Sequence, residues 1–80
     1  MTKSLKILIV EDDDALAKNL ERFLSDIAEI TVSNDGLEGQ MLGQDGIYDL
    51  AVLDLMLPQV SGYDILKYWR HECQLEMPVL

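Results

Sequence analysis

Short apolar runs alternate with segments of helical periodicity along this chain. The first run, 6–10, is almost unbroken, which is typical of a strand covered on both faces. A helix is predicted after it, because apolar residues recur at helical spacing with polar residues between them. These apolar positions are Leu16, Leu20, Phe23, Leu24 and Ile27. Asp13 or Asp14 can cap this helix, since a short carboxylate accepts hydrogen bonds from unpaired N–H groups of the first turn.

The rest of the chain repeats the alternation of strand and helix. Strands are predicted at 29–33 and 48–53, with the opening of another at 77–80. The helix expected at 37–44 is weakened by two glycines, each costing about 1 kcal/mol relative to alanine. A longer helix, of about ten residues, is expected after its cap, Ser61. One face of that helix would be formed by Ile65, Leu66, Trp69 and Cys73.

This alternation predicts the fold class. Strands and helices that follow one another with long connections form a parallel, doubly wound α/β sheet with right-handed crossovers. At 80 residues the chain makes one small domain, 1–80. Ligands bind such sheets outside the carboxyl ends of the strands.

Two predicted strands run directly into acids at that edge. The run 7–10 leads into Glu11, Asp12 and Asp13, and the run 50–53 leads into Asp54. Neighbouring parallel strands would bring these carboxylates together, and their repulsion is relieved by a proton or a hard cation. Pro58 ends the strand pattern after Asp54, and we expect a loop in which Gly62 adopts an unusual backbone conformation.

Composition narrows the classes of partner. The chain is 49% hydrophobic and carries 15 Asp and Glu against 6 Lys and Arg, for a net charge of −9. A globular segment of this charge repels nucleic acid and anionic membranes, and no stretch has the length of a membrane span. The lone Cys73 cannot form an internal disulfide, and the N-terminus lacks a signal-peptide pattern, so we expect a cytoplasmic location.

The acids and their spacing carry a resemblance. Asp54 follows Asp12 by 42 positions. Pro58 follows Asp54 by four positions and Gly62 follows it by eight, all within the segment 49–62, DLAVLDLMLPQVSG. In this order the chain resembles the receiver domain of two-component response regulators. The resemblance implies a flavodoxin-like fold, with strand order 2-1-3-4-5 in the complete domain. The chain would cover about two-thirds of that domain, ending within its fourth strand.

The resemblance also implies a role for each acid. Asp54 would be the phosphoacceptor that takes a phosphoryl group from a histidine kinase. Mg²⁺ would be held by Asp12, Asp54 and the backbone carbonyl of Met56, with Glu11 reaching it through water. Phosphoryl transfer requires such neutralisation, because a carboxylate nucleophile and an anionic donor repel each other.

Functional positions of the family beyond the fourth strand would lie outside this chain: a Ser or Thr, a Lys and a switch aromatic residue. An attached effector domain, often DNA-binding, would also follow Leu80 and regulate transcription. Without the last helix and the fifth strand, one sheet face and one sheet edge would stay uncovered. We therefore expect the free 80-residue chain to fold poorly or to self-associate.

Other functions remain open at this point. A receiver-like assembly module that does not switch is one alternative. A Mg²⁺-dependent phosphatase is less consistent, because Met56 stands where such enzymes place a second Asp. An EF-hand fails, since Leu16 and Arg22 occupy the Gly and Glu positions counted from Glu11.

The remaining chemistry-bearing residues have structural explanations. We interpret Asp13 as a cap or a solvent-facing acid, and His71 as a residue that complements the dipole at a helix end. Cys73 is expected to pack rather than react. Turn or boundary positions are assigned to Asp35, Asp45 and Asp49.

Overall fold

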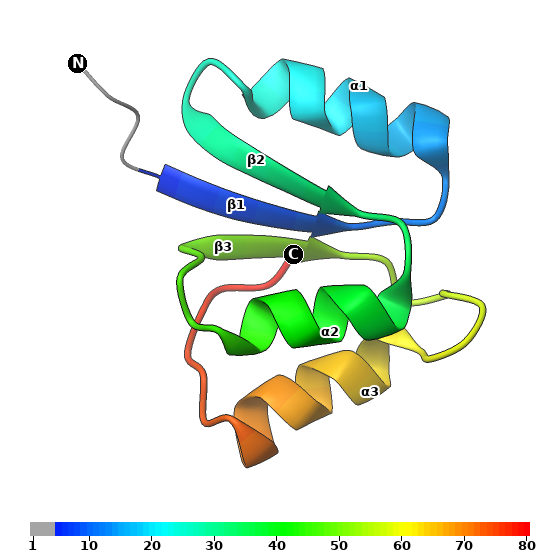
Figure 1. Cartoon of the computed structure of the whole chain (residues 1–80), viewed down its shortest axis with the longest axis vertical. Coiled ribbons are helices and arrows are strands. Elements are labelled where there is room, and N and C mark those ends of the chain that lie inside the picture. Colours follow the sequence, from blue (N-terminus) through cyan, green and yellow to red (C-terminus); the bar gives the residue numbers. More distant parts are fainter. Residues whose placement is uncertain (1–4) are drawn as a thin grey trace.

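A computed structural model describes residues 5–80, so residues 1–4 of the expected domain 1–80 lie outside the described part. Its sheet contains three parallel strands in the order β2-β1-β3, namely β1 (Leu5–Val10), β2 (Ala28–Ser33) and β3 (Leu50–Leu53) (Figure 1). This order and the parallel direction confirm the predicted fold class. Among the described residues, no helix combines the length and apolarity that crossing a membrane requires.

Each helix begins at a short polar side chain. The carboxylate of Asp13 accepts a hydrogen bond from the third residue on (3.2 Å) and caps α1 (Asp14–Leu24). The Asp35 carboxylate accepts from the second residue on and caps α2 (Gly36–Gln44), and the Ser61 hydroxyl accepts from the third residue on and caps α3 (Gly62–Lys67). Asp35 is therefore a helix cap as well as a boundary residue.

The third helix does not end at its last α-helical residue. It continues into η1 (Tyr68–Glu72), a π-helical segment, so the expected helix of about ten residues is present with a change of pitch in its second half. Trp69 lies in this wider turn and is fully buried. Its indole N–H donates to the backbone carbonyl of Gln40 in α2, at 3.0 Å, and so joins the two helices.

The helices cover the sheet unequally. Alternate residues of β1 face opposite sides: Ile7 and Ile9 pack with Leu20 and Leu24 of α1, whereas the other face packs against α2 and α3. The buried members of that second cluster are Leu8, Val10, Ala51, Leu53, Leu57, Ile65, Trp69 and Met77. The continuous apolar run of β1 is thus explained by burial on both faces.

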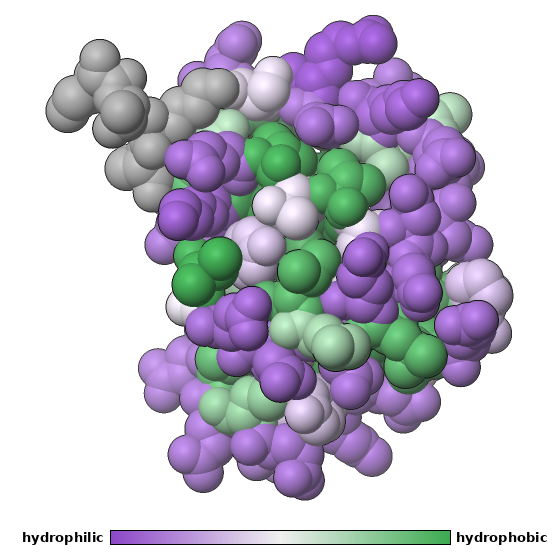
Figure 2. Space-filling view, viewed as in Figure 1, coloured by the Kyte–Doolittle hydropathy of each residue, from purple (hydrophilic) through white to green (hydrophobic). Residues whose placement is uncertain are grey.

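The face shared with α1 is partly open. In β3, Ala51 and Leu53 are buried on the α2 side, while Leu50 and Val52 on the α1 side are only half-buried. Figure 2 shows hydrophobic residues gathered over the strands in the middle of the view, with hydrophilic residues around them. An apolar strip of the sheet therefore reaches the surface.

Only part of the apolar face predicted for α1 is buried. Leu20 and Leu24 pack on the sheet, but Phe23 is 81% exposed and Ile27, in the turn after the helix, is 58% exposed. Leu16 also stays largely exposed, and the fully buried residue of this helix is Ala17. Helical spacing identified the side of the helix, but only part of that side packs on the sheet.

The last residues lie beside β3. Backbone hydrogen bonds of 2.8–3.0 Å join 78–80 to Ala51 and Leu53, and Val79 forms a parallel bridge with Ala51. The expected fourth strand is therefore represented by this short pairing. The guanidinium group of Arg70 holds the preceding segment by donating to the carbonyls of Leu75 (2.8 Å) and Met77 (2.7 Å).

Candidate acidic site at the carboxyl ends of the strands

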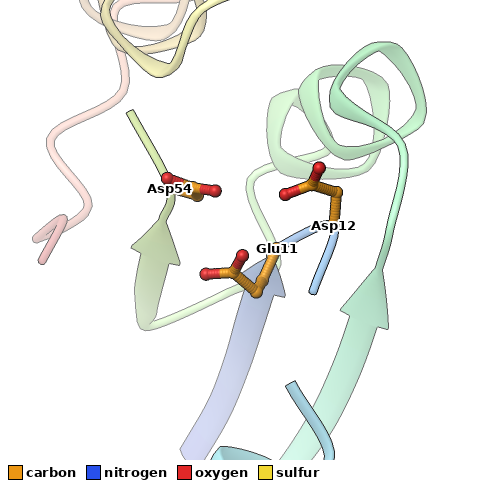
Figure 3. Close-up of side chains that lie close together, drawn as sticks. All are labelled: Glu11, Asp12 and Asp54. Atoms are coloured by element: carbon orange, nitrogen blue, oxygen red, sulfur yellow. The ribbon is translucent and has the colours of Figure 1, made fainter. Parts of the chain in front are cut away.

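Three carboxylates meet at the carboxyl edge of the sheet. Glu11, Asp12 and Asp54 each offer an oxygen atom that lies within 4.8 Å of the others, and the side chains point into one common space (Figure 3). Glu11 and Asp54 are half-buried, and Asp12 is exposed. The structure thus brings together the acids that follow the first and third strands.

Backbone hydrogen bonds of the sheet fix this convergence. Val10 pairs with Leu53, so both strands end at the same level. The Asp54 N–H donates to the Val10 carbonyl, and the Glu11 N–H donates to the Ser33 carbonyl, both at 3.0 Å. Glu11 and Asp54 therefore occupy the first positions after paired strands, where the sheet holds their backbone, and Asp12 follows one position later.

Electrostatics at the site favour a cation or a proton. Partial burial raises the pKa of the Glu11 carboxyl, and the neighbouring Asp54 and Asp12 carboxylates raise it further. A hydrogen bond from the Asp13 N–H to Glu11 Oε2, at 3.2 Å, opposes this shift. The net rise reflects partial burial first and the negative charge of the neighbouring carboxylates second.

The turn after Asp54 is closed by backbone contacts. The Met56 N–H donates to Asp54 Oδ1 (3.0 Å), which orients the carboxylate, and the Met56 side chain is 86% exposed. The Gly62 N–H donates to the Leu55 carbonyl (3.1 Å). The start of α3 is thereby fastened to the residue that follows Asp54.

Gly62 has a different role from the one expected. Among the described residues, positive φ occurs at Gly46 and Gln74, and Gly62 begins a regular helix. A Cβ at this position would lie 2.3 Å from the Asp54 carbonyl oxygen and 2.7 Å from Leu55 Cα. Glycine is required here by close approach of two backbones, not by an unusual conformation.

Asn34 is a participant that sequence reasoning missed. Its side-chain amide donates to the backbone carbonyl of Glu11 at 3.0 Å, across 23 positions of sequence. The sequence Asn-Asp-Gly indicated only a turn, and no local pattern reveals a contact over this separation.

Other singled-out residues lie apart from the three acids. Asp13 caps α1, and Asp45 caps the C-terminal end of α2. Asp49 accepts a hydrogen bond from the Lys6 N–H (2.8 Å) at the opposite end of the strands. His71 is exposed in η1. Cys73 is the first residue after η1 and is half-buried.

The donor set fits a hard divalent cation. Carboxylate and carbonyl oxygens are the ligands that Mg²⁺ and Ca²⁺ prefer, and softer metals would call for His or Cys. Within the described residues, the acids 11, 12 and 54 form the single group of this kind. The arrangement can therefore concentrate a cation beside the strand-end carboxylate of Asp54.

Comparison with known proteins identifies the family of this chain. The sequence model of the response regulator receiver domain family matches residues 7–80. Transcriptional regulatory protein CiaR of Streptococcus pneumoniae is 45% identical over 76 residues, and CusR of Escherichia coli is 38% identical over 77 residues. Each alignment covers 95% of this chain and 34% of the relative, so the chain spans about a third of these proteins.

Solved structures extend the agreement to three dimensions. The receiver domain of the Francisella response regulator 1452 superposes with a TM-score of 0.87 at 30% identity, covering 95% of this chain and 63% of that one. A response regulator receiver domain from Clostridium thermocellum gives a TM-score of 0.85 at 25% identity and covers 62% of its chain. The chain belongs to the response regulator receiver domain family of two-component signalling.

Proposed function

We propose that this chain is the N-terminal part of a phosphoacceptor domain in which Asp54 receives a phosphoryl group from a sensor histidine kinase. The observation that supports this most strongly is the convergence of Glu11, Asp12 and Asp54 at the ends of two paired strands. A strand-end carboxylate beside other acids is a suitable nucleophile only when a cation offsets the repulsion of an anionic donor.

Each residue has a defined role in this proposal. Asp12, Asp54 and the Met56 backbone carbonyl would hold Mg²⁺ directly, and Glu11 would reach it through water. When bound, Mg²⁺ neutralises charge on the oxygens of the phosphoryl group. The Met56 N–H on Asp54 Oδ1 favours attack by the other oxygen, Oδ2.

The transfer itself is an in-line displacement. A carboxylate oxygen of Asp54 forms a bond to phosphorus while the bond from phosphorus to the donor histidine nitrogen breaks, and that nitrogen keeps the electron pair. The product is an aspartyl phosphate, and attack by water later releases inorganic phosphate. The chain is thus a signalling module and not a turnover enzyme for an external substrate.

The output is proposed from the relatives. CiaR and CusR are named transcriptional regulatory proteins, and the chain matches about a third of each. We propose that an effector domain outside the matched region controls transcription, and that this acidic segment makes no nucleic-acid contact itself. The hydroxyl and Lys partners of the phosphoryl group would come from the remainder of the domain.

A second candidate is an assembly module that cannot switch. The half-buried Leu50 and Val52 favour it, because exposed apolar sheet surface promotes association. Light scattering on the 80-residue chain tests this candidate. Concentration-dependent dimers support it, whereas a cooperatively unfolding monomer at all concentrations contradicts it.

The phosphoacceptor proposal is tested by intact-mass measurement. The chain is incubated with Mg²⁺ and phosphoramidate, whose bond between phosphorus and nitrogen resembles that of phosphohistidine. We expect one phosphoryl adduct that is lost in Asp54→Asn and strongly reduced in Asp12→Ala. An adduct that persists in Asp54→Asn contradicts the assignment of the nucleophile.

Matched chains separate the remaining alternatives. If the 80-residue chain is unreactive but a longer one that includes the rest of the domain is labelled at Asp54, the segment depends on the missing hydroxyl and Lys groups. Steady release of phosphate from unrelated phosphate esters indicates a phosphatase instead.

A further inference from the structure

The segment that carries Asp12 is attached to the end of β2 at two points. The Glu11 N–H donates to the Ser33 carbonyl, and the Glu11 carbonyl accepts from the Asn34 amide, both at 3.0 Å. The first bond continues the register of the sheet, in which Val10 pairs with Ser33. The second bond lies beyond the sheet and depends on a side chain.

Asn34 is free for this contact because its neighbours take the local roles. Ser33 is buried, and its hydroxyl donates to Glu38 Oε1 at 2.8 Å. Asp35 caps α2, and Gly36 is buried where a Cβ would lie 2.7 Å from Val60. The Asn34 amide therefore serves no helix end and reaches across to the neighbouring loop.

The bonded carbonyl belongs to the peptide unit that leads to Asp12. A peptide unit is planar, so fixing the Glu11 carbonyl oxygen also fixes the direction of the Asp12 N–H and the position of its Cα. Asp12 is exposed, and packing contributes little to holding it in place. A hydrogen bond at this carbonyl is thus a direct means of orienting the Asp12 carboxylate toward Asp54.

We propose that Asn34 is a positioning residue for the cation site, acting through the Glu11 carbonyl on Asp12. This inference rests on the proposed function in that the cation held by the acids is Mg²⁺. Second-layer hydrogen bonds at metal sites typically tune affinity without contacting the metal. Loss of one such bond is expected to weaken Mg²⁺ binding about three- to tenfold.

The test compares Asn34→Ala with Gln44→Ala, which removes another exposed side-chain amide, one that accepts from the Tyr68 hydroxyl. Mg²⁺ is titrated while the backbone N–H signal of Asp12 is followed by NMR. We expect Asn34→Ala to shift the midpoint three- to tenfold upward and Gln44→Ala to leave it unchanged. Equal midpoints for Asn34→Ala and the unaltered chain overturn the inference.

A second readout needs no substitution. In chain labelled with ¹⁵N and ¹³C, the hydrogen bond predicts a scalar coupling between Asn34 Nδ2 and the Glu11 carbonyl carbon, and its absence overturns the inference.

Phosphorylation gives the third comparison. At saturating Mg²⁺ the labelling rate of Asn34→Ala should return to that of the unaltered chain, and a rate that stays low contradicts a role in positioning the cation site. Failure of the proposed function looks different. Mg²⁺ would then bind with the expected dependence on Asn34, but Asp54 would not be labelled in any length of chain.

Discussion

Replacing Gly62 with alanine tests whether the backbone around Asp54 is positioned by the start of α3. The added Cβ would lie 2.3 Å from the Asp54 carbonyl oxygen, 2.7 Å from Leu55 Cα and 3.0 Å from the Asp54 carbonyl carbon. All of these are backbone atoms, so no rotamer change relieves the overlap. Either α3 or the segment carrying Asp54 must move.

The size of the effect follows from these contacts. Overpacking in a tight site costs about 1–3 kcal/mol, and stretching the hydrogen bond from Gly62 to Leu55 removes up to about 1 kcal/mol more. The better helix propensity of alanine returns at most about 1 kcal/mol. We therefore expect a loss of about 2 kcal/mol in the free energy of unfolding.

The site should suffer in addition to the stability. Bringing the Cβ contact from 2.3 Å to 3.0 Å requires a displacement of about 0.7 Å between α3 and the Asp54 backbone. Mg²⁺ demands nearly ideal octahedral geometry, so a shift of this size in one ligand should weaken its binding roughly tenfold or more. Urea unfolding and the Mg²⁺ titration measure the two effects separately.

Gly43→Ala is the matched control. Its Cβ would lie 2.2 Å from Trp69 Cζ2, a clash of equal severity that involves a buried side chain and not the acidic site. We expect comparable destabilisation with unchanged Mg²⁺ affinity in the folded chain. If Gly62→Ala keeps the stability and the Mg²⁺ affinity of the unaltered chain, the close-approach explanation is refuted.

Three further perturbations probe charge, capping and the C-terminal segment. The pKa of the Glu11 carboxyl is raised in the folded chain, so its ionisation lowers the free energy of unfolding of the metal-free chain as pH rises above about 4.5. In thermal scans without metal, Glu11→Gln should therefore raise the unfolding midpoint at pH 7 and leave it unchanged at pH 4. Asp13→Ala removes the cap of α1 and should cost about 1 kcal/mol in urea unfolding, an effect that a retained midpoint would contradict. Arg70→Ala removes two charge-assisted hydrogen bonds to backbone carbonyls and should cost about 1–3 kcal/mol, with faster hydrogen exchange at the Leu80 N–H. Unchanged exchange at this N–H would contradict the role of Arg70 in holding the C-terminal segment.

The sequence was informative wherever one local pattern had one physical cause. The unbroken run before Glu11 predicted a strand buried on both faces, and β1 lies at the centre of the sheet. Asp13 and Ser61 precede helices as expected, because capping involves atoms only a few residues apart. The meeting of the acids followed from parallel pairing of two strands that each end in a carboxylate.

Features that depend on distant partners were not predictable from local patterns. Helical spacing placed Phe23 and Leu24 on one side of α1, but which of them is covered depends on how the sheet packs against the helix. Gly62 looked like a turn residue because a close approach to Asp54 leaves no mark in the nearby sequence. The amide of Asn34 likewise finds its acceptor 23 positions away.

The proposed function requires that acids following two different strands hold one cation beside Asp54. Mn²⁺ substitutes for Mg²⁺ at oxygen-ligand sites and broadens NMR signals of nearby nuclei, so it reports directly where the cation lies. Titration of Mn²⁺ should broaden the backbone N–H signals of 11–13 and 54–56 at the same concentration, with Mg²⁺ reversing both. Broadening of one segment without the other, or first at Asp45 and Asp49, would contradict a shared site.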